Sequence, residues 1–99
     1  MNPGLIPPAD VAAAAKKGLE LREKFHRGGT SVGVHRAQQL AERRDVTFRD
    51  ITAISAYFAR HEVDKASKSR EWGDETDPSA GYIAWLLWGA SPAVAGRTV

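Results

Sequence analysis

The densest group of ionisable side chains lies at residues 60–65, where His61 and Asp64 are three residues apart. On a helix this spacing places both side chains on one face, so that they could bind one metal ion together. The segment lacks the second histidine of the His-Glu-x-x-His zinc motif, and two ligands do not complete a metal site. We therefore favour ion pairing and helix capping here, and we expect no metal ion or other cofactor.

Residues 27–33 place two glycines and two hydroxyl side chains ahead of an expected helix, an arrangement that can bind an anion. The segment has neither the lysine nor the spacing of a phosphate-binding P-loop, so a turn between two helices is the simpler interpretation. The chain contains no cysteine, and no serine can be grouped with a histidine and an acid as a nucleophile. We therefore predict that the protein is not an enzyme.

Binding to nucleic acid is the third possibility, because residues 16–44 are rich in Lys and Arg whereas residues 45–78 contain more acids than bases. Residues 30–61 are expected to form a helical hairpin that resembles a helix-turn-helix in outline. The side chains that would read DNA from it are Arg49, Thr52, Ala53 and Tyr57. Against this, Asp50 would meet the phosphates, and the net charge is only +2. The candidate nucleic-acid contacts are Lys16, Lys17, Arg27, Arg36, Arg43, Arg44 and Arg49.

The element expected to organise the fold is a helix at 79–89, where seven successive residues from Tyr82 to Trp88 are apolar or aromatic. Ser79 can cap this helix and Gly89 can end it. A helix that is apolar on most of its circumference belongs at the centre of a core, although a buried strand is the rival interpretation for so short a run. The run is far too short to cross a bilayer, and we expect no membrane contact.

Three earlier helices are expected around this central one. The first follows an Asp10 cap and runs from 11 to about 27, where Gly28-Gly29 ends it. The second follows Thr30 or Ser31 and runs to about 43, and Gly33 within it would permit close approach of another backbone.

The third helix follows a capping box formed by Thr47 and Asp50, and runs to about residue 62. Its apolar positions follow helical spacing and predict a buried stripe. This stripe consists of Phe48, Ile51, Ile54, Ser55 and Phe58. The polar residues 65–78 are expected to form a long loop, with Trp72 folded back on the body.

The composition indicates one ordinary globular domain, with 42% hydrophobic and 26% charged residues in a chain of 99. The absence of cysteine excludes disulfides and thiolate metal sites. We predict an all-α, compact bundle of about four helices over residues 10–99, preceded by an extended arm at 1–9 that contains three prolines. The arm is expected to fray in an isolated monomer, unless Leu5 and Ile6 bind a neighbouring subunit.

Four stretches of the chain, at 18–22, 27–37, 57–65 and 78–89, resemble a small module of tailed-bacteriophage virion and head-morphogenesis proteins. The two most specific stretches read YFARHEVDK at 57–65 and PSAGYIAWLLWG at 78–89. The resemblance covers about residues 10–95. After Gly89 the module continues with Gly-Asp-Ala-Gly-Arg and an aromatic residue, where this chain has Ala90-Ser91-Pro92-Ala93.

The resemblance implies a virion component, made in the host cytoplasm, that decorates or cements the capsid or joins the neck. Its expected partners are phage capsid or other virion proteins, with self-association as a further possibility. The residues expected at this interface are Leu5, Ile6, Tyr82, Trp85 and Trp88. Two alternatives stay open: a small DNA-binding protein that uses the 30–61 hairpin, and an inhibitor of a host protein whose acidic loop 71–77 mimics nucleic acid.

Overall fold

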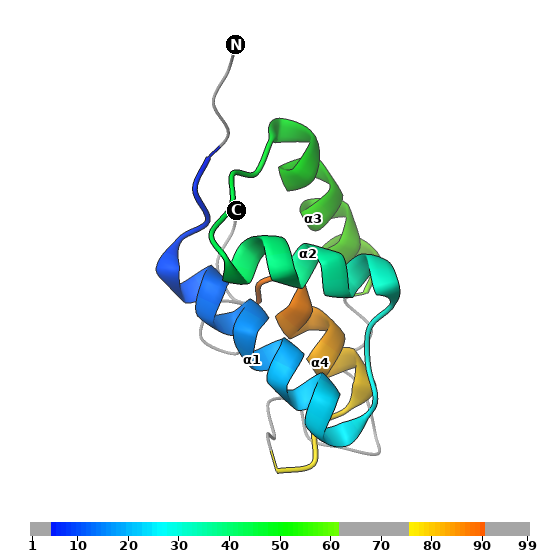
Figure 1. The fold of residues 1–99 in the computed structure, drawn as a ribbon. Coiled ribbons are helices and arrows are strands. Elements are labelled where there is room, and N and C mark those ends of the chain that lie inside the picture. The colour runs from blue at the N-terminus through cyan, green and yellow to red at the C-terminus, as the bar shows by residue number, and fades with distance from the viewer. Residues whose placement is uncertain (1–4, 62–75, 91–99) are drawn as a thin grey trace.

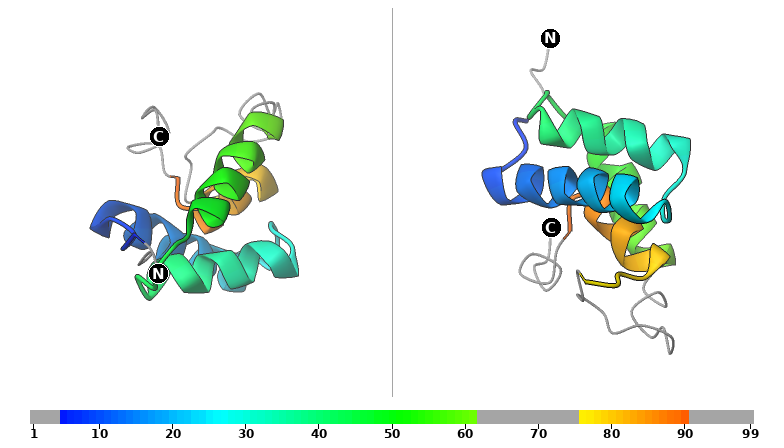
Figure 2. Two further views of the ribbon diagram at one scale, coloured as in Figure 1. Left: turned by 90° about the horizontal axis from the view of Figure 1, so that it is seen from above. Right: turned by 60° about the horizontal axis from the view of Figure 1, so that its bottom comes forward.

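The computed structural model describes residues 5–61 and 76–90, and it confirms the predicted all-α bundle. The helices are α1 (Ala9–Phe25), α2 (Ser31–Ala41), α3 (Phe48–Arg60) and α4 (Ala80–Leu87). Figure 1 shows α1 and α4 side by side, α2 running across them, and α3 standing apart from this three-helix body. The view from above in Figure 2 shows that α3 is inclined steeply to α1 and α2. Asp64 and Trp72 lie outside the described residues.

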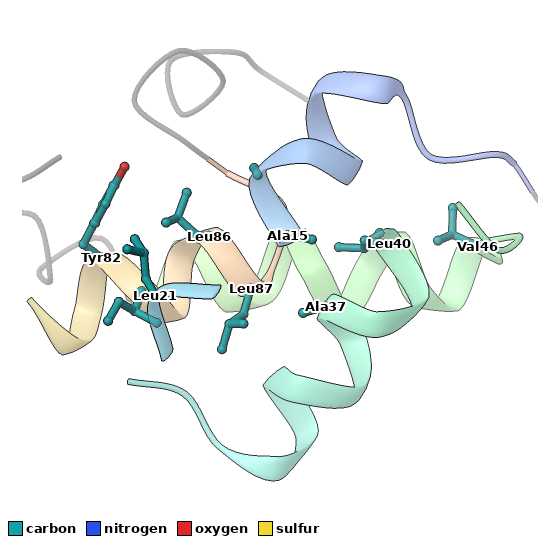
Figure 3. Packing of buried hydrophobic residues seen from close by; sticks show 10 residues of the cluster. Ala15, Leu21, Ala37, Leu40, Val46, Tyr82, Leu86 and Leu87 are labelled. Atoms are coloured by element: carbon teal, nitrogen blue, oxygen red, sulfur yellow. The ribbon is translucent and has the colours of Figure 1, made fainter. Parts of the chain in front are cut away.

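The core forms around α4, as predicted. Tyr82, Ile83, Leu86 and Leu87 are almost completely buried, since each keeps 1% or less of its surface exposed. They pack against small and branched side chains of α1 and α2 (Figure 3), which are Ala14, Ala15, Leu21, Ala37 and Leu40. Burying a large apolar side chain contributes roughly 1.5–3 kcal/mol, so this cluster is the main source of stability in the described fold.

Helices α1 and α4 approach each other closely at Gly18. A Cβ atom added to Gly18 would lie 2.8 Å from the backbone nitrogen of Leu87 and 2.9 Å from Cβ of Leu86. We had predicted such an approach at Gly33 instead, where an added Cβ would meet the side chain of Trp88, with Nε1 at 3.3 Å. Gly33 therefore makes room for an indole ring, and Gly18 makes room for a backbone.

Local capping chemistry sets most of the helix ends. The Thr30 hydroxyl accepts the Gly33 N–H at 3.3 Å, and the Ser79 hydroxyl accepts the Tyr82 N–H at 3.0 Å. The predicted capping box is present, because Thr47 accepts the Asp50 N–H at 3.1 Å and Asp50 accepts the Thr47 N–H at 2.8 Å. These bonds satisfy backbone donors that the first helical turn leaves without partners.

The predicted ends of α1 were wrong by two residues at each end. Pro8, which has no side-chain cap bond, precedes the helix, and Asp10 lies inside its first turn, where it accepts the Val11 N–H at 2.9 Å. The last turn closes on His26, which has φ 54° and donates its N–H to the Arg22 carbonyl at 2.8 Å. The helix therefore ends on a left-handed histidine before it reaches the two glycines predicted to end it, and both glycines also have positive φ.

The prediction that the apolar stripe of α3 is buried was also wrong. Phe48 is 82% exposed, Ser55 is exposed, and the other three members are only partly buried. The one buried residue of α3 is Tyr57, which the helical pattern had placed off the stripe. The physical reason is that α3 does not join the three-helix body along its length, so its apolar face borders an open cleft.

Candidate functional site

Residues 5–8 of the N-terminal arm lie against the connection between α2 and α3. Leu5 and Val46 form an antiparallel bridge, with N–H to carbonyl distances of 2.8 and 2.7 Å in the two directions. The Arg43 side chain donates from Nε to the Pro7 carbonyl at 2.9 Å, and Pro7 is fully buried. The expected fraying of the arm is therefore wrong for residues 5–8, yet Leu5 and Ile6 both remain more than half exposed.

The arm, α3 and the end of α4 enclose an apolar cleft of about 660 Å³. Among the described residues that line it, none has a charged side chain, and the Ser55 hydroxyl is the single polar side-chain group besides the tryptophan nitrogens. Its lining residues include Leu5, Ile6, Val11, Ile51, Ile54, Phe58, Trp85 and Trp88. Such a lining suits apolar groups, because a polar group placed in it would lose its bonds to water.

The carboxyl end of α3 is held to α4 by aromatic rings. The rings of Tyr57 and Trp88 are stacked with centroids 4.5 Å apart and planes 6° apart. The rings of Phe58 and Trp85 lie 4.7 Å apart, and Trp85 donates from Nε1 to the His61 carbonyl at 3.1 Å. Of the residues in these contacts, Phe58, Trp85 and Trp88 also line the cleft.

The amino end of α3 is held to α2 by a polar cluster centred on Asp50. One carboxylate oxygen accepts from the Arg36 guanidinium at 2.8 Å, and the other accepts from the Gln39 amide at 3.1 Å. The Thr47 backbone N–H, followed by the Arg36 side chain and then Gln39, holds the pKa of Asp50 well below its ordinary value. Arg36 also lies 5.4 Å from the centroid of the Trp88 ring, so the polar cluster and the aromatic contacts of α3 adjoin each other.

Replacing Asp50 with asparagine is expected to lower the free energy of unfolding by about 1–2 kcal/mol at pH 7, because hydrogen bonds to a charged group are lost. A depressed folded-state pKa stabilises the protein fully above the ordinary Asp pKa of about 3.9, and this stabilisation is lost as pH falls further. Wild type and Asp50→Asn should therefore converge in stability below about pH 4.

Urea unfolding from pH 7 to pH 2.5 measures this convergence. Asp45→Asn changes an exposed acid in the same turn and serves as control; equal losses in both variants would contradict the role of Asp50.

Four of the five residues predicted at an interface do meet at the cleft. Leu5 and Ile6 border it from the arm, while Trp85 and Trp88 border it from α4, although only 3% of Trp85 is exposed. The fifth, Tyr82, is 1% exposed and packs in the core, where no partner can reach it. The prediction missed the α3 side of the cleft. The sequence pattern of an apolar helical stripe is the same whether the stripe faces a core or an open groove.

The residues predicted to contact nucleic acid do not form one free basic face. Five of the seven are engaged within the chain. Arg36 and Arg43 donate to Asp50 and to the Pro7 carbonyl, Arg27 pairs with Asp77 at 3.1 Å, Arg44 pairs with Glu42 at 3.3 Å, and Lys17 also has an interaction within the chain. Lys16, Lys17 and Arg49 lie on different helices, α1 and α3. Of the residues predicted to read bases, Tyr57 is buried and the Thr52 hydroxyl donates to the Phe48 carbonyl at 3.0 Å.

The predicted metal pair is only half described, because Asp64 lies outside the described residues. The His61 ring stacks on Tyr57 with centroids 4.3 Å apart. Over residues 5–61 and 76–90, no three His or acidic side chains converge as metal ligands, and no helix is long and apolar enough to cross a membrane. Comparison of the chain with protein-family models, with curated proteins and with solved structures found no match.

Proposed function

We propose that this protein is a non-enzymatic structural component of a bacteriophage particle that acts through protein–protein contacts. The surface we assign to these contacts is the cleft together with the protruding side chains of Leu5, Ile6 and Phe48, which we call the apolar face. The observation that carries the proposal is the exposure of these three large apolar side chains around or beside an uncharged cleft.

Exposed apolar surface of this kind is typical of interaction sites. Single exposed apolar residues are common, but contiguous apolar patches on soluble proteins mark binding surfaces. The described part of the chain has four large apolar residues that are strongly exposed, and all except Val32 border the cleft or continue its α3 wall. The aromatic residues at the cleft floor add the side chains that most often dominate binding energy.

The direct test is quantitative mass spectrometry of gradient-purified particles of the phage that encodes the chain. We expect the protein in the particle, and a copy number of the order of the major capsid protein would assign it to capsid decoration or cement. Absence from purified particles would refute the proposal.

The apolar face itself is tested by replacing Ile6 with glutamate. We expect incorporation into particles to fall at least about tenfold, because a charge at the cleft mouth must be desolvated on binding. Val32→Glu is the matched control, since Val32 is equally apolar and exposed but lies on α2 and does not line the cleft. Equal loss of incorporation in both variants would show that the apolar face is not the contact surface.

A further inference from the structure

Helix α2 ends on an arginine whose backbone has a conformation that side chains disfavour. The Arg43 N–H donates to the Leu40 carbonyl at 3.0 Å and the Arg44 N–H donates to the Gln39 carbonyl at 3.0 Å, which together form a Schellman cap. This cap places Arg43 in the left-handed region, with φ 53°. Glycine is the usual residue there, and a side chain disfavours the conformation about five- to thirtyfold. Unlike the histidine that ends α1, arginine is not among the residues enriched in this region, so its retention indicates a function for the side chain.

The side chain of Arg43 binds the N-terminal arm. Its Nε donates to the Pro7 carbonyl at 2.9 Å, and the ring of Pro7 is fully buried. The arm is also bound to the connection between α2 and α3 by the two bonds between Leu5 and Val46, at 2.8 and 2.7 Å. Leu5 and Ile6 are more than half exposed, so burial of their side chains contributes little. The docking of the described arm therefore depends on these hydrogen bonds and on the Pro7 ring.

The magnitudes of these contributions single out the bond from Arg43. Fixing the backbone of one residue costs about five- to thirtyfold in an equilibrium constant, and both Leu5 and Ile6 bear this cost on docking. A neutral hydrogen bond contributes only about two- to twelvefold, so the two bonds to Val46 do little more than offset that cost. A hydrogen bond from a charged donor contributes about 10- to 150-fold. Loss of the bond from Arg43 should therefore shift the arm toward release.

We propose that the N-terminal arm exchanges between a docked and a released form, and that Arg43 is the positioning residue that holds the docked form. In the docked form Leu5 and Ile6 line the cleft and complete the apolar face. In the released form both side chains leave the cleft, and the backbone bonds of Val46 to the arm are broken. The arm thereby controls whether the apolar face can bind. This regulation rests on the function proposed above, whereas the exchange is a property of the purified chain.

Amide hydrogen exchange measured by NMR on the full chain tests the exchange of the arm. In the wild type the amides of Leu5 and Val46 should be protected, but less than those of α4, because the arm opens without unfolding of the core. Arg43→Gln should lower their protection at least about tenfold, because a charged donor is lost. Arg44→Gln is the matched control and should leave protection unchanged, since Arg44 pairs with Glu42 and makes no hydrogen bond to the described arm.

Replacing Arg43 with glycine separates the arm contact from the stability of the helix end. Arg43→Gly should release the arm as fully as Arg43→Gln does. It should nevertheless unfold at a higher urea concentration than Arg43→Gln, because glycine suits the left-handed position. Protection of the arm that instead followed overall stability across the two variants would contradict a specific role of the guanidinium.

Two further results would overturn the proposal. One is wild-type protection of Leu5 and Val46 equal to that of α4, because the arm would then open only when the core unfolds. The other is an equal loss of protection in Arg43→Gln at the Glu42 amide, which donates to the Gln38 carbonyl at 3.1 Å. That loss would mean that the end of α2 frays and that the arm does not open by itself.

Incorporation into phage particles tests the regulation separately. Arg43→Gln should lower incorporation, as Ile6→Glu does, whereas Arg44→Gln should not. Unchanged incorporation of Arg43→Gln with a released arm would refute the regulation and leave the proposed function intact. Absence of the wild type from particles would refute the proposed function and the regulation with it, while the exchange of the arm would stand.

Discussion

Replacing Gly18 with valine is expected to destabilise the fold by about 3 kcal/mol or more. The new Cβ would lie 2.8 Å from the backbone nitrogen of Leu87 and 3.0 Å from the carbonyl carbon of Leu86. Backbone atoms of a packed helix cannot turn aside as a flexible side chain can, so α1 and α4 must separate. A small domain has a total stability of only about 5–15 kcal/mol, and the variant should lose a large part of it.

Urea unfolding monitored by circular dichroism and by tryptophan fluorescence measures this loss. Ala13→Val is the matched control, because Ala13 is exposed on the same helix and the substitution adds the same β-branched side chain. The control measures the cost of a β-branched side chain on an exposed face of α1, which is less than about 0.7 kcal/mol relative to alanine, whereas helix propensity favours valine over glycine at position 18. A loss at position 18 no larger than that at position 13 would show that the close approach of α4 does not set the cost.

The parts of the fold that the sequence predicted well are those determined by neighbouring residues. The Thr30 and Ser79 caps and the Thr47–Asp50 box each need only a side chain and a backbone N–H about three residues apart. The central position of α4 was predictable for a similar reason, since a helix that is apolar on most sides has no face to present to water.

The position of α3 was not predictable, because it depends on contacts that are distant in the sequence. Nothing near Tyr57 indicates that its ring will stack on Trp88, thirty-one positions along the chain. Likewise, Asp50 binds Arg36 as well as its own capping partner, and this bond draws the start of α3 toward α2. An apolar stripe specifies that a face avoids water; it does not specify which element or partner covers that face.

The candidate site was predictable in part. Leu5 and Ile6 stood out because they are large apolar residues within a proline-rich arm that cannot form helix. The tryptophans were chosen for their type, and their place at the cleft follows from contacts with α3, where Trp88 stacks on Tyr57 and Trp85 packs against Phe58. Phe48 was assigned to a core stripe, and only its 82% exposure distinguishes it from the other members.

Replacing Trp88 with alanine is expected to release α3 from the rest of the molecule, with a loss of about 3 kcal/mol or more. The Trp88 ring stacks on Tyr57 of α3, lies over the Arg36 guanidinium of α2, and occupies the space left by Gly33. Over the described residues no comparable contact joins α3 to α1, so α3 would keep three attachments: the pairing of Phe58 with Trp85, the hydrogen bond from Trp85 to the His61 carbonyl, and the Asp50 cluster.

Amide hydrogen exchange measured by NMR distinguishes this local release from general destabilisation. In Trp88→Ala the amides of α3 should lose protection by a larger factor than those of α1 and α4, because α3 opens without unfolding of the core. Trp88→Phe keeps an aromatic ring against Tyr57 and should restore most of the protection. A uniform loss across all four helices would contradict this. It would mean that Trp88 supports the core directly, and that the cleft is a fixed cavity rather than one whose α3 wall can move when a partner binds.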